Sequence, residues 1–574
     1  MRLRPIILTI IAGIIGLGAG ATLVAFNRES NAEPFGLLYR VIDKLEREVA
    51  AFTTPANSGP PTEYFPTTFT GMRGTVIQIP RADMPGTGGG LAVVGDETLV
   101  VTFRGLIYTV DSDGNWDQAE IAVPDYGLEA YRTAATKPEY AAFDADFGRL
   151  RYNELEYLAS PQGRFLFLTF TEFHAGRDCY TLTLARLALP DGPVADLKVV
   201  SDDWETIFRS APCLPLRGVV QAIQGEEAGG RIAFSNDNAK AYLSVGEYGW
   251  NGWHSDGLTE LSTRQLAQDA DADQGKVIEI DLQTLEARHF SSGHRNMQGI
   301  TVDDQGRVFA VEHGARGGDE LNLIEDGNNY GWPIVTYGTN YSGAPIPGVQ
   351  SLGRHTGFTE PVYAWLPSVG ISGLLAQKAS FHPTWDDDLL AISLDGNTLF
   401  RIRLDDSRVI FAEEINLGRR LRDIEQKDDG SLVIWTDSHE VIFLTPLQGG
   451  FGEQFIESYI SDLSASEPEL AIALERAVDE CSVCHSFSRH EQRIGPSLAR
   501  VHGAPMGSVA GFDYSPAMAQ ASGRWTNAML ADYLLDPTAV VVGTSMPDPG
   551  MDDPAVRNRL VEVLEALSKA ELRD

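Results

Sequence analysis

Cysteine is scarce in this sequence, with four residues among 574, and basic side chains are outnumbered by acidic ones. So few cysteines exclude a small scaffold that is held together by many disulfides. The 45 lysines and arginines against 80 aspartates and glutamates give a net charge of -35, which repels phosphate backbones. We therefore expect no nucleic-acid partner.

A long apolar run without charge occurs at the amino terminus, where Pro5 to Phe26 follow the basic start MRLR. The run is long enough to cross a bilayer with the amino terminus inside. We favour a retained transmembrane helix in a bacterial inner membrane, with the rest of the chain in the periplasm. A cleaved signal peptide is the alternative, because Ser30, Asn31 and Ala32 form a small-x-small site.

Export places Cys179 and Cys213 in an oxidising compartment, where a disulfide persists. We expect these two cysteines to pair, and two separate buried thiols are the alternative. The other two cysteines, Cys481 and Cys484, belong to a different motif.

Six β-rich segments repeat one pattern between about residues 70 and 446: an apolar start, a polar turn, then alternating hydrophobic residues. They begin at Leu91, Leu158, Ile232, Ile300, Phe381 and Ile424. Each is typical of the central hairpin of a propeller blade, because Asp, Asn and Gly turns join strands that alternate faces. The repeats predict a mainly β protein with a six-bladed β-propeller, since separate β-sandwiches do not explain six similar hairpins.

A haem attachment motif lies near the carboxyl terminus. Cys481 and Cys484 are three residues apart and His485 follows directly, in the run CSVCH. This spacing lets both thiols bond haem vinyl groups while the imidazole binds the iron. A zinc site needs two further ligands at suitable spacing, and a redox dithiol does not need the histidine. The motif therefore predicts covalent haem c.

The surrounding residues resemble class I cytochromes c, in CSVCH, in GPSL from Gly495 and in GTSMP from Gly543. The resemblance implies a small all-α domain in which Met546 is the second iron ligand and Pro496 orients His485. A thioether ligand raises the potential of the iron, which suits an electron acceptor. The alternative sulfur ligands are Met506, Met518, Met529 and Met551.

These patterns divide the chain into five parts. Residues 1–32 are the membrane anchor or signal segment, 33–69 a stalk or linker, and 70–450 the propeller. Residues 451–466 form a second linker, because the turn formers PLQGGFG start at Pro446 and helical spacing returns from about Pro468. Residues 467–574 form the cytochrome c domain.

An unusual run, GHRNMQGI from Gly293, lies between the third and fourth hairpins, and a second, EHGARGGDELNLIEDGNNYGWP from Glu312, follows the fourth. Here the chain resembles the soluble quinoprotein sugar dehydrogenases, six-bladed propellers that bind pyrroloquinoline quinone (PQQ) and calcium and oxidise aldoses. PQQ is a flat quinone with carboxylate groups, so its site needs forked cationic donors, amides and a metal.

The resemblance implies two sets of site residues. Contacts to PQQ are expected from Arg295, Asn296, Gln298, Ser368, Arg420 and Arg422. Calcium ligands are expected at Gly314 and Ala315 for the cofactor's calcium, and at Glu320 and Tyr330 for a separate structural calcium.

The chain also departs from this family. Glu227 stands where the family has its general-base histidine, and Glu247 matches the carboxylate that orients that histidine. Two close carboxylates do not both ionise cheaply, so we expect the pKa of one of them to be raised. Asp395 falls where some relatives have a lysine that contacts PQQ, and a negative group there should weaken binding. The alternative bases are His174, His254 and His313.

The leading interpretation is a periplasm-facing quinoprotein dehydrogenase that oxidises a sugar or alcohol at Glu227 and Glu247. It would pass electrons to its own haem and then to a downstream respiratory acceptor. The alternative is a degenerate propeller that serves as a binding or docking module, with the cytochrome domain as the only redox centre. The retained arginines favour the enzyme, whereas the loss of the histidine and the lysine favours the module.

Overall fold

The computed structural model describes residues 60–68, 71–79, 87–137, 149–216, 223–253, 260–446, 451–489 and 493–570. The expected anchor at 1–32 and most of the stalk at 33–69 lie outside these ranges. Within the described ranges, no helix is both long and apolar enough to span a bilayer.

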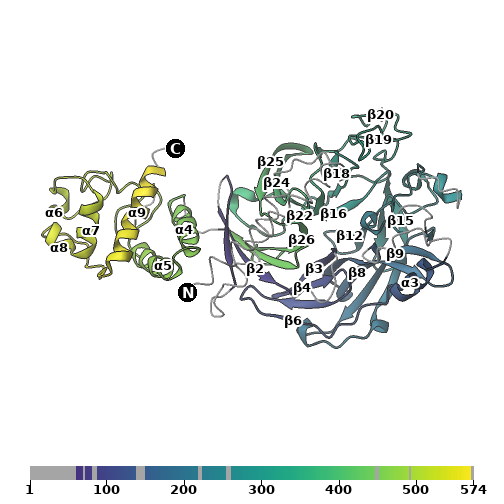
Figure 1. The fold of residues 1–574 in the computed structure, drawn as a ribbon, viewed down its shortest axis with the longest axis horizontal. Coiled ribbons are helices and arrows are strands. Elements are labelled where there is room, and N and C mark those ends of the chain that lie inside the picture. Colours follow the sequence, from purple (N-terminus) through teal and green to yellow (C-terminus); the bar gives the residue numbers. More distant parts are fainter. Residues whose placement is uncertain are drawn as a thin grey trace, which may run out of the picture. The chain divides into compact units, whose positions relative to one another are not determined.

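Six antiparallel sheets make up the first and larger part of the described chain, as the repeats predicted (Figure 1). The first consists of β3 (Gly89–Val94), β4 (Glu97–Thr102), β5 (Ile107–Val110) and β6 (Trp116–Gln118). The second consists of β7 (Tyr152–Ser160), β8 (Gly163–His174), β9 (Cys179–Leu189) and β10 (Glu205–Arg209), with β11 (Leu214–Pro215) beside β9. The helix α3 (Leu128–Ala135) lies between these two sheets in the sequence.

The next three sheets repeat the same order. The third consists of β12 (Gly229–Phe234), β13 (Lys240–Val245), β14 (Lys276–Asp281) and β15 (Ala287–Ser292). The fourth consists of β16 (Met297–Val302), β17 (Val308–Glu312), β18 (Asp319–Ile324) and β21 (Tyr363–Trp365), with the short pair β19 (Val335–Thr336) and β20 (Ser351–Leu352) inserted before β21. The fifth consists of β22 (Ile371–Ala376), β23 (Leu389–Ser393), β24 (Thr398–Asp405) and β25 (Arg408–Asn416).

The sixth sheet joins the two ends of the propeller. It takes β26 (Leu421–Gln426), β27 (Leu432–Thr436) and β28 (Glu440–Pro446) from the end, and β1 (Thr62–Pro66) and β2 (Gly71–Gln78) from the start. Strands β2 and β28 pair antiparallel along their length, from Met72 opposite Pro446 to Gln78 opposite Glu440. The propeller therefore begins at β1, inside the range that we expected to be a linker.

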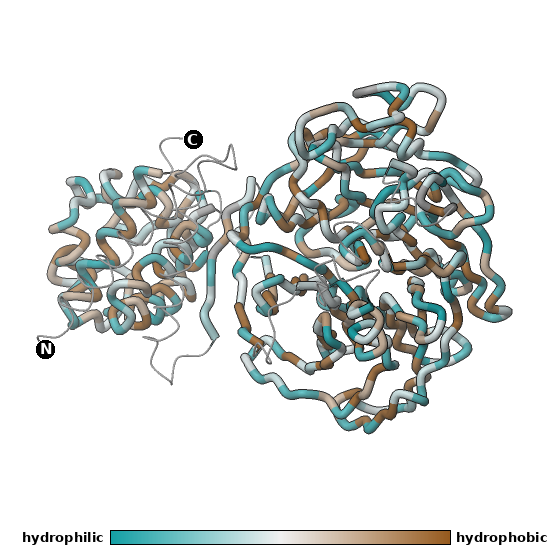
Figure 2. Tube along the Cα trace, turned by 45° about the vertical axis from the view of Figure 1, so that its right-hand side comes forward, coloured by the Kyte–Doolittle hydropathy of each residue, from teal (hydrophilic) through white to brown (hydrophobic). Residues whose placement is uncertain are grey.

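The first strand of each sheet lines the axis of the ring. Each of these strands contacts the next around the ring, in the order β3, β7, β12, β16, β22 and β26, and β26 contacts β3 again. Figure 1 shows most of these strands gathered near the middle of the sheet-rich part, and Figure 2 shows hydrophobic and polar residues interspersed along the chain. Because every sheet repeats the same strand order, the inner strands all begin at the same end of the axis.

In five of the six sheets the repeated hairpin forms the two strands nearest the axis rather than the centre of the sheet. In the fifth sheet the expected apolar start is wrong, because Pro383 to Trp385 form a 3-10 turn and the first strand is β22, farther upstream. Pro383 lacks an N–H for a sheet, and Trp385 is fully buried against neighbouring blade residues.

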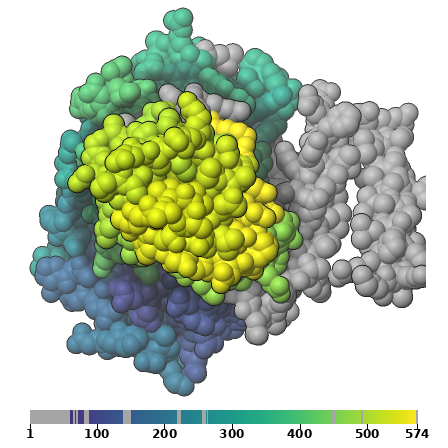
Figure 3. All heavy atoms as spheres, turned by 90° about the vertical axis from the view of Figure 1, so that its left-hand side faces the viewer, coloured from purple at the N-terminus to yellow at the C-terminus, as the bar shows by residue number. Residues whose placement is uncertain are grey.

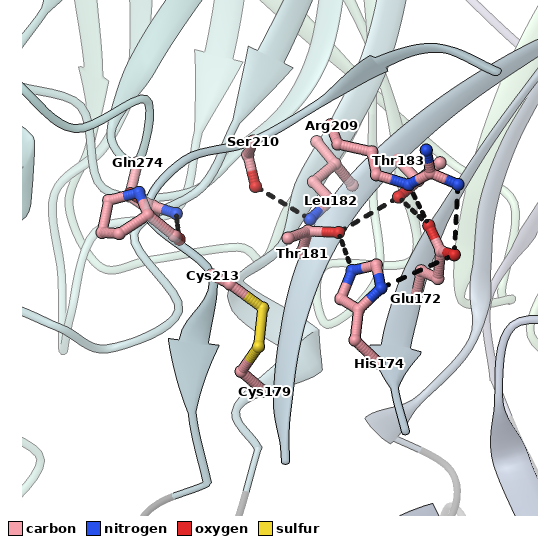
Figure 4. The surroundings of a disulfide bond; sticks show 11 residues. Glu172, His174, Cys179, Thr181, Leu182, Thr183, Arg209, Ser210, Cys213 and Gln274 are labelled. Carbon is pink, nitrogen blue, oxygen red and sulfur yellow. Dashed lines mark hydrogen bonds and ion pairs between the residues drawn. A yellow bond between two sulfur atoms is a disulfide. The ribbon is translucent and has the colours of Figure 1, made fainter. Parts of the chain in front are cut away.

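The expected disulfide is confirmed. Cys179, the first residue of β9, is bonded to Cys213, which lies just before β11 (Figure 4). The link fixes the segment after β10 against the sheet. Beside it, His174 bonds to Thr181 at 2.9 Å and lies 3.8 Å from Glu172.

The remaining described residues, 451–489 and 493–570, form six α-helices and the loops between them, and they are the green to yellow atoms of Figure 3. The helices are α4 (Phe451–Ser464), α5 (Pro468–Ser482), α6 (Pro516–Ala519), α7 (Asn527–Leu535), α8 (Pro537–Val540) and α9 (Pro554–Ala570). The expected linker at 451–466 is wrong, because most of it is α4, which packs against α5 and α9. Glu453 on α4 accepts bonds from the Phe487 N–H at 2.8 Å and from the Ser486 hydroxyl at 2.9 Å. The helix is thereby tied to the residues that follow the haem motif.

Acidic residues gather inside the propeller on β7 and β26. Arg231 on β12 pairs with Glu154 and, at 3.1 Å, with Asp423. Burial and the nearby charge of Asp423 together raise the pKa of Glu425 to about 7, although Lys378 lowers it in part. Burial also raises the pKa of Glu156, and Glu425 adds to that rise. The inner strands therefore retain protons on carboxyl groups near neutral pH.

These protons make the stability of the propeller depend on pH. The pKa of Glu425 is raised from 4.5 to about 7, so its stabilising contribution is present below about pH 4.5 and is lost as the pH rises through 7. The free energy of unfolding of the wild type should fall between about pH 4.5 and pH 7. We expect this fall to be smaller by about 1–3 kcal/mol in Glu425→Gln. Urea unfolding followed by circular dichroism at several pH values measures this. The control Glu414→Gln, on an exposed strand position, should keep the wild-type dependence of the unfolding free energy on pH. An unchanged dependence on pH in Glu425→Gln would contradict the assignment.

Candidate functional site

The candidate cofactor site lies where the inner strands begin. Glu227 ends the 3-10 helix η4 (Gly225–Glu227) before β12, and Arg295 lies just before β16. Ser368 precedes β22, and Arg420 precedes β26. Residues that are far apart in the sequence therefore reach the same end of the axis.

Arg295 is central to this site and is buried, with 8% of its surface exposed. Its Nη2 pairs with the Glu227 carboxylate, and its Nη1 donates to the Gly314 carbonyl oxygen at 3.0 Å. Its main-chain N–H donates to Glu312 Oε2 at 2.8 Å, and its guanidinium carbon lies 5.4 Å from the centre of the Trp332 ring. Arg295 thus joins the predicted catalytic carboxylate to the predicted calcium loop.

Glu247, the second predicted catalytic carboxylate, also lies beside Arg295. It is fully buried, and its main-chain N–H donates to the Arg295 carbonyl oxygen at 2.9 Å. Burial would lower the pKa of Arg295, but the charges of Glu227 and Glu247 raise it. The guanidinium is therefore close to both carboxylates and offsets the repulsion that we expected between them.

Asn296 and Gln298 are buried and bond to other protein groups. Asn296 Nδ2 donates to the Glu226 carbonyl oxygen at 3.0 Å, and its Oδ1 accepts from the Gly229 N–H at 3.2 Å. Gln298 Nε2 donates to the same Oδ1 at 2.8 Å. In this structure the two amides fix the turn that carries Glu227.

Arg420 and Arg422 form ion pairs with acidic residues. Arg422 makes two bonds to Asp437, from Nε at 2.8 Å and from Nη2 at 3.0 Å. Arg420 contacts Asp437 at 3.2 Å and Asp395 at 3.1 Å. Burial would raise the pKa of Asp437, but the two guanidinium groups lower it. Asp395, which we expected to repel an anionic cofactor, is paired with Arg420.

Asp319 joins the predicted calcium loop to the segment that carries Ser368. Its Oδ1 accepts from the Gly314 N–H at 3.0 Å, and its Oδ2 accepts from the N–H groups of Val369 at 3.0 Å and Gly370 at 2.7 Å. Ser368 Oγ is buried and has no hydrogen-bond partner among the described residues. A buried hydroxyl left open in this way fits a contact with a bound cofactor.

A cavity of about 20 Å³ lies beside this loop and is lined in part by Gly314, Glu320 and Tyr330. Its volume suits one water or ion. Burial raises the pKa of Glu320. The Tyr330 hydroxyl donates to the Leu323 carbonyl oxygen, so the main-chain oxygen of Tyr330 is the atom left for a metal. Among the described residues, no three His, Cys, Asp or Glu side chains are placed to hold a metal ion. Calcium here would therefore depend on main-chain oxygens such as those of Gly314 and Ala315.

Two residues that build this site, Asp319 and Asp437, were not predicted from the sequence, and His313 was expected only as an alternative base. Asp319 is the first residue of β18 and Asp437 follows β27, and neither lies in a sequence pattern that distinguishes it from other strand-end aspartates. The main-chain N–H of His313 donates to the Asn296 carbonyl oxygen at 3.0 Å, and its Nε2 is buried without a partner among the described residues. His174 lies beside the disulfide instead, and His254 is outside the described residues.

A second cavity, of about 760 Å³, lies in the helical part and is lined by Cys481, Cys484 and His485. The two thiols are not bonded to each other. Burial raises the pKa of Cys481 to about 11, whereas redox dithiols have a lowered pKa. The motif therefore fits thioether bonds to haem better than a redox pair.

His485 is oriented as an iron ligand. Its Nδ1 donates to the Pro496 carbonyl oxygen at 2.7 Å, which leaves Nε2 for the metal. Burial lowers the pKa of His485, and a neutral imidazole is the form that binds iron. A Cβ at Gly495 would overlap the His485 ring, so glycine leaves the space that the imidazole occupies.

Two of the methionines line this cavity: Met546 and Met518. Met546 follows a turn in which the Thr544 hydroxyl accepts its main-chain N–H at 3.3 Å. Met551 is buried in the helical core and is not part of the cavity wall. The structure therefore leaves Met518, rather than Met551, as the alternative to Met546.

A family model for glucose/sorbosone dehydrogenases matches residues 157–444. The aldose sugar dehydrogenase YliI of Escherichia coli is 31% identical over 278 residues, which cover 44% of this chain and 66% of that protein. The crystal structure of the soluble aldose sugar dehydrogenase of Escherichia coli in its apo form has a TM-score of 0.51 at 23% identity. It covers 66% of this chain and all of that one, and the likeness shows the same fold.

The helical part has a different set of relatives. Cytochrome c2 iso-2 of Magnetospirillum fulvum is 36% identical over 87 residues, which cover 15% of this chain and 91% of that protein. The likeness between the carboxyl-terminal part and cytochromes c is therefore confirmed.

The axial ligand can be tested by substitution. We expect Met546→Ala to lose the long-wavelength absorption band of sulfur bound to ferric haem and to lower the reduction potential, since the thioether stabilises ferrous iron. The haem should remain attached in denatured protein, because the thioether bonds to Cys481 and Cys484 are covalent. Met551→Ala is the matched control and should keep the band. Loss of the band in Met518→Ala, with its survival in Met546→Ala, would contradict the assignment.

Proposed function

The chain belongs to the glucose/sorbosone dehydrogenase family, and on this premise we propose that its propeller oxidises a hydroxyl group of a sugar or alcohol with bound PQQ. The electrons would pass to haem c in the helical part of the same chain. The observation that carries the proposal is the convergence of Arg295, Arg420, Arg422 and the open hydroxyl of Ser368 at one end of the axis. A polycarboxylate quinone needs such a set of donors.

Glu227 is the proposed base. One of its oxygens pairs with Arg295, and we find no hydrogen-bond partner for the other among the described residues. That second oxygen is placed to accept the proton of a substrate hydroxyl, while Arg295 holds the carboxylate in position. When bound, PQQ supplies the two-electron acceptor, and calcium on the Gly314 loop would polarise it.

Joining both redox parts in one chain has a kinetic reason. A tether replaces a bimolecular encounter by a high local concentration of the electron acceptor. A haem with sulfur and nitrogen ligands accepts one electron at a time, so it suits transfer to a further respiratory carrier.

A second candidate, a binding module without its own chemistry, is favoured by one specific observation. Arg420 and Arg422 are already paired with Asp395 and Asp437, so their charges are offset without a cofactor. A bound polycarboxylate would have to compete with these aspartates.

Reconstitution separates the two candidates. Protein with mature haem is mixed with PQQ and calcium, and the haem spectrum is followed while aldoses and alcohols are added. Haem reduction that requires both PQQ and a substrate supports the enzyme. We expect Glu227→Gln to bind PQQ but to lose about two or more orders of magnitude in turnover. Glu226→Gln, which alters the neighbouring carboxylate, is the control. Full activity in Glu227→Gln would exclude this base, and no haem reduction in the wild type would favour the module.

We also propose that the protein is exported and held to the inner membrane by Pro5 to Phe26. The disulfide between Cys179 and Cys213 supports an oxidising compartment. We expect the protein to stay in the membrane fraction in 1 M salt, because apolar insertion is insensitive to screening. Fractionation and amino-terminal sequencing check this, and a mature protein that begins at Glu33 would contradict the anchor.

A further inference from the structure

Arg151 is a buried arginine at the start of the inner strand β7. Only 7% of its surface is exposed. Its Nε donates to Asn153 Oδ1 at 3.1 Å, and its Nη1 donates to the Thr87 carbonyl oxygen at 3.4 Å. Both partners are neutral, and among the described residues no carboxylate forms an ion pair with Arg151.

Five other arginines around this end of the axis have acidic partners. The pairs are Arg149 with Glu226, Arg231 with Glu154, Arg295 with Glu227, Arg420 with Asp395, and Arg422 with Asp437. Glu226 and Asp437 are also near enough to influence Arg151, but each is bonded to its own arginine. Arg151 therefore differs from these five arginines, because no acidic side chain among the described residues forms an ion pair with it.

A glycine beside Arg151 leaves room for its side chain. Gly88 has a φ of 132°, and a Cβ there would lie 3.1 Å from Arg151 Cδ. Burial and the like charge of Arg422 lower the pKa of Arg151 to about 10, so the guanidinium keeps its charge at neutral pH. A buried positive charge without a counter-ion is unfavourable, and an anion that enters the site would remove this cost.

We propose that Arg151 is a carboxylate-binding residue of this site, and the inference rests on the proposed function. Its position at the start of an inner strand places it at the same end of the axis as Arg295 and Arg422. The carboxylate belongs either to the quinone cofactor or to the substrate, which would then be a sugar acid such as a uronic acid rather than a neutral aldose. A forked guanidinium binds a carboxylate by two parallel bonds.

The test uses full-length protein with mature haem and the variants Arg151→Gln, Arg151→Lys and, as an exposed control, Arg354→Gln. Calorimetry measures PQQ binding with calcium, and a second titration measures glucuronate and glucose binding. We expect Arg151→Gln to weaken one carboxylate ligand at least about tenfold, with partial recovery in Arg151→Lys. Weaker PQQ binding identifies the cofactor as the source. Weaker glucuronate binding at unchanged PQQ and glucose binding identifies a sugar acid.

A stability measurement separates this role from a structural one. Removing an unpaired buried charge should leave the ligand-free melting temperature of Arg151→Gln unchanged or higher, whereas loss of a structural arginine would lower it. If the wild type binds no PQQ, the proposed function fails, and glucuronate binding that depends on Arg151 still decides the inference. Unchanged binding of both ligands in Arg151→Gln, or a lowered melting temperature, would overturn it.

Discussion

The pairing of β2 with β28 is the contact on which the rest of the propeller depends. A ring of sheets closes only if its first and last strands pair, and here residues separated by most of the propeller sequence form one sheet. Closure keeps the six inner strands in their circle. Glu227, Arg295, Ser368 and Arg420 lie just before inner strands, so their positions relative to one another depend on this closure.

Charge compensation is the second constraint. The mouth of the axis contains several buried or half-buried arginines in a chain with a large excess of acid. Asp395, Asp437 and Glu227 supply the opposite charges for Arg420, Arg422 and Arg295, so these three arginines have acidic partners without a ligand. Such pairs also raise the cost of binding an anionic cofactor, because an ion pair must be exchanged rather than simply formed. Under the proposed function, affinity for PQQ would therefore depend on how these pairs rearrange, as well as on the number of arginines.

The helical part has a different requirement, because the expected haem is flat and apolar and needs an iron ligand in a fixed orientation. The bond from His485 to the Pro496 carbonyl sets the direction of the imidazole, and the absence of a side chain at Gly495 gives it room. Helix α4 adds to this part through the bonds that Glu453 makes to the residues after the motif. Its hydrophobic side chains join the core of α5 and α9, so its residues are not a linker.

Local patterns in the sequence by themselves determined the haem motif and most of the propeller blades. The CSVCH run predicted the haem site, because its chemistry needs only neighbours in the chain, and the alternation of five hairpins predicted blades. The turn at Pro383, helix α4, and the roles of Asp319 and Asp437 were decided by tertiary structure. So was the pairing of Glu227 with Arg295, which places a positive charge close to two carboxylates that were expected to repel each other. The physical reason is that ion pairs and burial depend on distances between segments far apart in the sequence, and those distances exist only once the ring has closed.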